Sequence, residues 1–157
     1  MINRDMSSSL TLFLGGTVGK STWRDTLIPL LEQAKLKYFN PVVEDWDSSA
    51  RIKENIIKSS LETVELYVIT SEMRGVYSIA EAVDASNKKP DKTIFMIKRD
   101  GFNSNQLYSL DATLSIIQNN GAYISESIFD IVRIFKSIEL AHRVPRVSIL
   151  ARKNKLL

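Results

Sequence analysis

Short apolar runs alternate with longer segments of helical spacing along almost the whole chain, and this alternation limits the fold more than any other feature. The apolar runs have the length of buried strands, and the segments between them carry apolar residues three and four positions apart. A chain in which strands and helices alternate builds a parallel sheet covered by helices on both faces. We therefore predict a three-layer α/β domain.

The pattern predicts five strands and five helices. The strands fall at residues 10–14, 37–39, 64–70, 93–97 and 122–124, and the helices at 22–35, 49–60, 77–86, 107–118 and 127–140. Pro29 lies within the first predicted helix, where it favours a kink. In the second helix, Ile52, Ile56 and Ile57 share one side.

Composition indicates one domain without covalent or metal cross-links. The chain has 157 residues, of which 44% are hydrophobic, enough for a core of its own. We place this domain at residues 9–141, between a flexible N-terminus (1–8) and a basic tail (142–157). Cysteine is absent and His142 is the single histidine, so we predict no disulfide, no metal site and no cofactor.

The termini bear on location and partners. The N-terminal residues lack the apolar core of a signal peptide, and no apolar run approaches the roughly 18 residues of a membrane span, so we expect a cytoplasmic protein without a membrane partner. The tail from His142 onward is basic and contains no acid. Because no aromatic residues are interleaved with its cations, we expect a solvated or subunit-contacting tail, and we do not expect a nucleic-acid partner.

Ligands of parallel α/β sheets bind beyond the carboxyl ends of the strands, so the loops there are the candidate site. Gly15, Gly16 and Thr17 follow the first predicted strand and precede a helix. Glycines at this place let the backbone approach a phosphate or a ribose, and a helix N-terminus favours an anion. The alternative is a simple tight turn.

The triplet Gly19-Lys20-Ser21 invites comparison with a P-loop, but the context differs. A P-loop needs a glycine where this chain has Leu14. The strand over 64–70 also ends without the acid that would share a magnesium ion. An NTPase is therefore a minor alternative.

The loop over residues 40–47 combines polar groups with an indole. Asn40, Asp45 and Asp47 could bind a base or a sugar hydroxyl, and Trp46 could stack on a base. The alternative is an aspartate that caps the next helix, with Trp46 packed beneath it. The sequence leaves both interpretations open.

Glu81 lies about one turn into the predicted helix that follows the third strand. An acid on a helix is usually a solvated surface residue. Here its neighbours Ile79, Ala80, Ala82 and Val83 indicate a mostly buried segment. A buried carboxylate needs a partner, which favours a functional role for Glu81.

These segments together resemble the nucleoside 2-deoxyribosyltransferase-like proteins over about residues 10–140. The matching stretches are Leu12-Phe13-Leu14-Gly15-Gly16-Thr17, Trp23-Arg24, Phe39-Asn40-Pro41-Val42-Val43-Glu44-Asp45-Trp46, Leu66-Tyr67-Val68-Ile69-Thr70-Ser71-Glu72-Met73, Gly75-Val76-Tyr77-Ser78-Ile79-Ala80-Glu81 and Lys89-Pro90. The resemblance implies a flavodoxin-like or Rossmann-like fold with a five-stranded parallel sheet. It also implies cleavage of the N-glycosidic bond of a (deoxy)nucleoside or nucleotide, with Glu81 as nucleophile.

The resemblance implies further roles around Glu81. A second base or water would release the sugar from a glycosyl ester, giving a transferase or a hydrolase. Gly15 and Gly16 would hold the 5′ end of the sugar, while Tyr77 and Ser78 would orient the sugar or the carboxylate. Further expected substrate contacts are Thr17, Asn40, Trp46, Asp47, Glu72 and Gly75. Members of the family form homo-oligomers in which a neighbour closes the site.

The second acid of the family has no clean counterpart in this chain. Asp45, Asp47, Glu54 and Glu72 are the candidates, and we place Asp45 first. The missing acid favours an alternative function, a non-catalytic module that binds or senses a nucleotide. A glycohydrolase acting on NAD is another alternative, since such Rossmann-like enzymes also use a helix glutamate.

Overall fold

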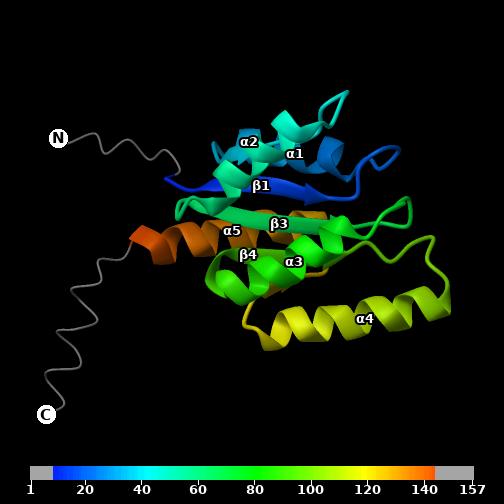
Figure 1. Cartoon of the computed structure of the whole chain (residues 1–157). Coiled ribbons are helices and arrows are strands. Elements are labelled where there is room, and N and C mark those ends of the chain that lie inside the picture. The colour runs from blue at the N-terminus through cyan, green and yellow to red at the C-terminus, as the bar shows by residue number, and fades with distance from the viewer. Residues whose placement is uncertain (1–8, 144–157) are drawn as a thin grey trace, which may run out of the picture.

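Five parallel strands form the centre of the protein, seen here in a computed structural model that describes residues 9–143 (Figure 1). The strands are β1 (Thr11–Gly16), β2 (Lys37–Phe39), β3 (Thr63–Ile69), β4 (Thr93–Ile97) and β5 (Tyr123–Ser125). Their order in the sheet is β2-β1-β3-β4-β5, with every pair parallel. The predicted flavodoxin-like sheet is confirmed. The predictions for residues 1–8 and for 144–157 of the tail lie outside the described residues.

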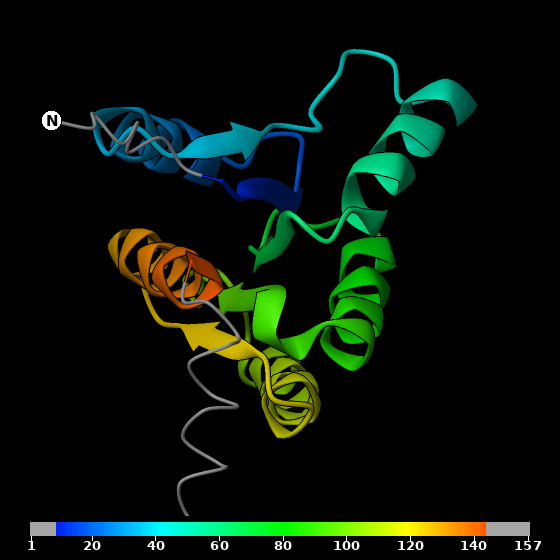
Figure 2. The same ribbon diagram turned by 90° about the vertical axis from the view of Figure 1, so that its left-hand side faces the viewer.

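Helices cover both faces of the sheet and complete three layers (Figure 2). The helices are α1 (Trp23–Gln33), α2 (Ser48–Ser59), α3 (Tyr77–Lys88), α4 (Ser104–Asn119) and α5 (Ile128–Arg143), with a short 3₁₀ turn, η1 (Pro90–Lys92), before β4. Helices α1 and α5 pack on one face, and α2, α3 and α4 lie on the other. No helix among residues 9–143 is long and apolar enough to cross a membrane.

The strands alternate between the two cores, as the period of two requires. On β3, Leu66 and Val68 pack toward α1 and α5, whereas Tyr67 and Ile69 pack toward α3 and α4. All seven residues of β3 are buried because the strand is central in the sheet. This burial explains why the apolar runs located the strands so well.

The strand order reverses between β1 and β3. The chain leaves β1 toward β2 at one edge, and β3 then returns to the other side of β1. The loops after β1 and β3 therefore diverge, which opens a crevice at the carboxyl ends of these two strands.

Helix α2 departs from the usual amphipathic arrangement. Ile52 and Ile56 are 58% and 66% exposed, although they form the apolar side recognised in the sequence. Ile57 packs partly on the core, and Glu54 is the buried residue of the helix. Glu54 and Ile57, rather than Ile52 and Ile56, therefore form the inner side of α2.

Pro29 lies inside α1, which runs unbroken through it. The side chain of Pro29 is exposed, away from the core that Trp23, Leu27 and Leu31 form on the same helix. A proline on the outer side leaves the packed side of the helix intact.

Candidate functional site

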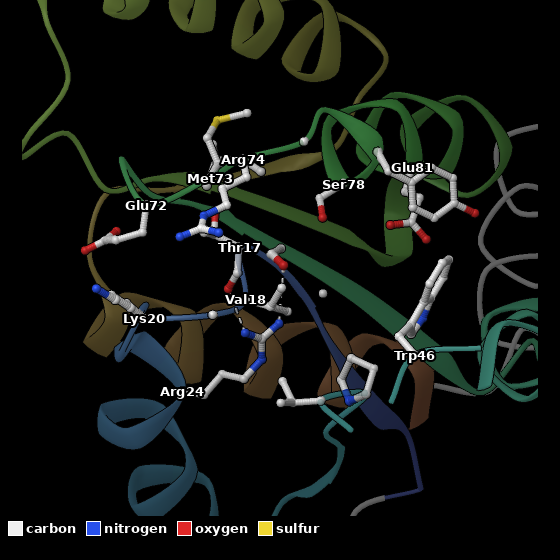
Figure 3. Close-up of a pocket in the computed structure, with 18 of the residues that line it drawn as sticks. Thr17, Val18, Lys20, Arg24, Trp46, Glu72, Met73, Arg74, Ser78 and Glu81 are labelled. Carbon is white, nitrogen blue, oxygen red and sulfur yellow. Dashed lines mark hydrogen bonds between the residues drawn. The ribbon is translucent and has the colours of Figure 1, made fainter. Parts of the chain in front are cut away.

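A cavity of about 970 Å³ opens at the carboxyl ends of β1 and β3, between the loops of the crevice and the helices α2 and α3 (Figure 3). It is at the upper end of the range for small-molecule sites. It is lined by Phe13, residues 15–20, Arg24, residues 41–43, Trp46, Glu54, Ile69, residues 71–75, Tyr77, Ser78 and Glu81. Both the predicted loops and the predicted helix thus contribute to one cavity.

Gly15 and Gly16 belong to β1 itself and are not a turn after it. A Cβ on Gly16 would lie 2.1 Å from the carbonyl oxygen of Val68, and the residue has a φ of +116°. A Cβ on Gly15 would lie 2.6 Å from the ring of Tyr67. Only glycine fits at either position, so β1 can approach β3 this closely and still expose its backbone to the cavity.

Thr17 and Arg24 fix the loop that follows β1. The Thr17 hydroxyl accepts a hydrogen bond of 2.9 Å from the backbone N–H of Thr70, which ties the ends of β1 and β3 together. The Arg24 guanidinium donates to the carbonyl oxygens of Leu14 and Thr17, with two bonds of 2.8 Å. Burial lowers the pKa of Arg24 to about 10.

Glu81 projects from α3 into the cavity wall (Figure 3). Its side chain is 13% exposed and forms an ion pair with Lys58 of α2, which is equally buried. Burial raises the pKa of Glu81 above its ordinary value, the ion pair with Lys58 opposes this rise, and the nearby Glu54 and Glu65 reinforce it. The result is a largely desolvated carboxylate whose protonation depends on its neighbours.

Two aromatic rings stand beside Glu81. Trp46 and Tyr77 lie with ring centroids 6.2 Å apart at an interplanar angle of 58°. The indole N–H of Trp46 donates a 2.9 Å hydrogen bond to the buried carboxylate of Glu54. Both rings are about half exposed, so they offer apolar faces to a planar ligand in the cavity.

A buried polar network supports the floor of the cavity. The Tyr67 hydroxyl donates to Glu65 at 2.7 Å, and Lys89 forms an ion pair with the other carboxylate oxygen at 2.9 Å. Lys89 also donates to the carbonyl oxygen of Lys58 at 2.7 Å. Burial, with the charge of Glu65, raises the pKa of Tyr67 and keeps its phenol protonated. The network thus fixes the ring under Gly15 and the backbone that carries Lys58.

The structure places most of the predicted site residues around this one cavity. Those that line it are Gly15, Gly16, Thr17, Trp46, Glu72, Gly75, Tyr77, Ser78 and Glu81. The other three predicted residues do not line it. Asn40 accepts a hydrogen bond from the N–H of Val42 at 3.2 Å, Asp47 caps α2 through the N–H of Ala50, and Asp45 is exposed.

The loop over 40–47 therefore divides between its two interpretations. Asp47 is the helix cap that the alternative described. Trp46 is not packed beneath that cap, because it is 53% exposed and lines the cavity.

Sequence reasoning missed Lys58 and did not choose Glu54. These residues are four positions apart on α2, so they share one side of the helix. The isoleucines at 52 and 56 instead indicated the other side of the helix as the buried one. Two opposite charges at this spacing on one side of the helix were the signal that could have indicated them.

A parallel sheet with a cavity at its switch point, flanked by aromatic rings and a buried carboxylate, is the arrangement of an α/β protein with a small-molecule site. The comparison with known families makes this more specific. The family model described as nucleoside 2-deoxyribosyltransferase like matches residues 9–100, more than half of the 157 residues, and the chain belongs to this family. The match covers β1 to β4 and all the residues that line the cavity. No curated protein matches the sequence.

Proposed function

We propose that this protein cleaves or transfers at the N-glycosidic bond of a nucleoside or nucleotide, with Glu81 as the nucleophile. The observation that carries the proposal is the position of Glu81, a desolvated carboxylate in the wall of the cavity beside two half-exposed aromatic rings. A carboxylate of this kind is the group that captures an anomeric carbon in a retaining glycosidic reaction.

The first step forms a glycosyl ester. The Glu81 carboxylate attacks the anomeric carbon, and the bond from that carbon to the base nitrogen breaks. The bonding electron pair leaves with the base, which takes up a proton from the second acid or from water. Positive charge develops on the sugar in the transition state, and the carboxylates of Glu81 and Glu54 in the cavity wall would stabilise it.

The second step releases the sugar. Water, or the nitrogen of a second base, attacks the anomeric carbon on the face that the first base left. The ester bond breaks and the Glu81 carboxylate is regenerated, while the attacking water or base gives up a proton to the second carboxylate or to solvent. The sugar keeps its original configuration. Hydrolase and transferase differ only in the group that attacks at this step.

Lys58 is proposed as the residue that keeps Glu81 ionised before attack. An adjacent ammonium favours the charged form of a buried carboxyl. Because the ion pair engages one carboxylate oxygen, Oε1, the other oxygen is the one proposed to attack.

Among the candidates for the second acid, Glu54 has the strongest support. Glu54 is buried in the cavity wall, where its charge acts on Glu81. Asp45 is exposed and outside the lining, and Asp47 is engaged as a helix cap. We therefore propose Glu54 as the second carboxylate, with Tyr77 and Ser78 orienting the sugar.

The test is chromatography of a panel of nucleosides and nucleotides incubated with the protein, with and without an added free base. Wild-type protein is expected to release or exchange a base, and Glu81→Ala to lose this activity. Glu44→Ala is the matched control, because Glu44 is exposed and does not line the cavity. If Glu81→Ala keeps the activity of the wild type, Glu81 is not the nucleophile.

A nucleotide-binding module without catalysis is the second candidate. The ion pair with Lys58 favours it, since a carboxylate held by a lysine is less free to attack. This candidate expects tight binding by calorimetry and no turnover across the panel. NAD belongs in the same panel, because release of nicotinamide would assign the protein as an NAD glycohydrolase.

We also propose that the protein works as a homo-oligomer. The exposed side of α2, with Ile52 and Ile56, lies on the same helix as Glu54 and Lys58. Apolar side chains next to a site are suited to burial against a neighbouring subunit. Light scattering after size-exclusion chromatography tests this, with Ile52→Glu expected to shift the mass to the monomer.

A further inference from the structure

Three cationic side chains, Lys20, Arg24 and Arg74, line one part of the cavity. We refer to this part as the cationic end. Figure 3 shows Lys20 and Arg74 close to Thr17 and Val18, whereas Glu81 lies with Trp46 at the opposite side of the cavity. The cavity therefore has two chemically different ends.

None of the three cations has a carboxylate partner among residues 9–143. The ion pairs of this part of the chain involve other lysines and arginines. Arg24 is 5% exposed, and its guanidinium donates hydrogen bonds to the carbonyl oxygens of Leu14, Gly16 and Thr17, so it adds a buried positive charge behind the loop. Lys20 and Arg74 are exposed and line the cavity, so their charged groups are the ones that can reach an anion there.

The loop after β1 adds hydrogen-bond donors to the same place. Within the described residues, the backbone N–H groups of Val18, Gly19 and Lys20 donate to no protein acceptor. Gly19 has a φ of +75° and nothing within 4 Å of the position of its absent Cβ. The loop leads into the N-terminus of α1, where the helix dipole also favours negative charge.

One carboxylate, Glu72, also lies at this end (Figure 3). It accepts a 2.5 Å hydrogen bond from the Thr70 hydroxyl, and the charge of Lys98 acts on it as well. Three cations against one engaged carboxylate leave the cationic end with a positive balance. An anion is therefore still attracted there.

We propose that the cationic end binds the 5′-phosphate of the substrate, so that the protein acts on nucleoside 5′-monophosphates in preference to nucleosides. This inference rests on the proposed function for the reaction at Glu81. A bound nucleotide would place its phosphate at Lys20 and Arg74, its sugar across Gly15 and Gly16, and its base beside Trp46. The phosphate contacts thus fall on the loop that follows the two glycines.

The binding test uses ligands that cannot react, so that it does not depend on catalysis. Calorimetry compares 2-deoxyribose 5-phosphate, inorganic phosphate and 2-deoxyribose on the wild-type protein. The phosphorylated sugar is expected to bind at least about tenfold more tightly than the free sugar, and to weaken as salt is added. Lys20→Ala and Arg74→Ala should each reduce this preference severalfold. Lys136→Ala on α5, which removes an exposed cation far from the cavity lining, should leave it unchanged.

The kinetic test compares kcat/KM for a nucleoside 5′-monophosphate and its nucleoside. The ratio is expected to favour the monophosphate by at least about tenfold, and to fall toward one in the Lys20→Ala/Arg74→Ala double variant. A ratio near one in the wild type, with turnover that depends on Glu81, overturns the inference and leaves the proposed function standing. Phosphate binding that depends on Lys20 and Arg74, without any turnover, supports the phosphate site and overturns the proposed function. Equal binding of 2-deoxyribose and its 5-phosphate also overturns the inference.

Discussion

The ammonium of Lys58 and the carboxylate of Glu81 form an ion pair across the two helices that flank the cavity, with 13% of each side chain exposed. The pair joins residues 23 positions apart in the sequence. Burial alone would keep Glu81 protonated to a higher pH than usual, and Lys58 counteracts this effect. The reactivity of Glu81 should therefore depend on Lys58.

Replacing Lys58 by methionine should shift the pH dependence of the reaction. Without the ammonium, the pKa of Glu81 rises further, so a larger fraction of the nucleophile is protonated at neutral pH. We expect the rising limb of the kcat/KM profile to move to higher pH by about one to three units. Lys88→Met is the control, since its partner Asp84 lies on the surface. A rising limb at the wild-type position in Lys58→Met would contradict this role.

The raised pKa of Glu81 also has a consequence for stability. Its carboxyl group holds a proton more tightly in the folded than in the unfolded protein. The contribution of Glu81 to the free energy of unfolding therefore falls as pH rises from the unfolded pKa, near 4.5, through the raised folded value. In Glu81→Gln, residue 81 does not titrate, so this pH-dependent contribution to the free energy of unfolding is absent.

Urea unfolding at a series of pH values measures this effect. The difference in free energy of unfolding, Glu81→Gln minus wild type, should increase with pH within that window and be flat below it. A difference that decreases with pH would mean that the folded protein lowers the pKa of Glu81 instead.

Gly16→Ala should destabilise the fold strongly. The new methyl group would meet the backbone of Val68 at 2.1 Å, at a φ of +116°. We expect a loss of about 3 kcal/mol or more in the free energy of unfolding, measured by denaturant titration. Gly75→Ala should change it by less than about 0.5 kcal/mol, since nothing lies within 4 Å of that position. Similar losses in the two variants would show that β1 and β3 are not packed as described.

Trp46→Ala should weaken substrate binding and leave the fold intact. The loss of a stacking surface is expected to raise KM by about tenfold or more. Because the indole is 53% exposed, the free energy of unfolding should change by less than about 1 kcal/mol. Trp46→Phe keeps a stacking ring but loses the N–H that donates to Glu54. Its KM should therefore lie between that of the wild type and that of Trp46→Ala. An unchanged KM in Trp46→Ala would show that the Trp46 ring does not contact the substrate.

The sheet could be predicted from the sequence because its signal is local. Each strand is a short apolar run, and the predicted bounds of 37–39 and 93–97 coincide with β2 and β4. The first strand was predicted too short, because Gly15 and Gly16 suggested a turn. Glycine is unfavourable in most strands, but here the close approach of β3 requires it.

The site was only partly predictable, because its key contacts join distant segments. The position of Glu81 could be inferred from its place after the third strand, whereas its pairing with Lys58 depends on how α2 packs. That helix places Glu54 in the cavity wall and Lys58 against Glu81, and it leaves Ile52 exposed, against its own apolar pattern. Tertiary placement overrode the local pattern at this helix.

The most direct test of the central claim is mass spectrometry of the protein after an acid quench during turnover. If Glu81 is the nucleophile, the peptide that contains residue 81 should gain the mass of the substrate's sugar, with or without its phosphate, as an ester. The adduct should be absent from Glu81→Gln treated in the same way. Turnover that continues in Glu81→Gln, or an adduct on a different residue, would contradict the account.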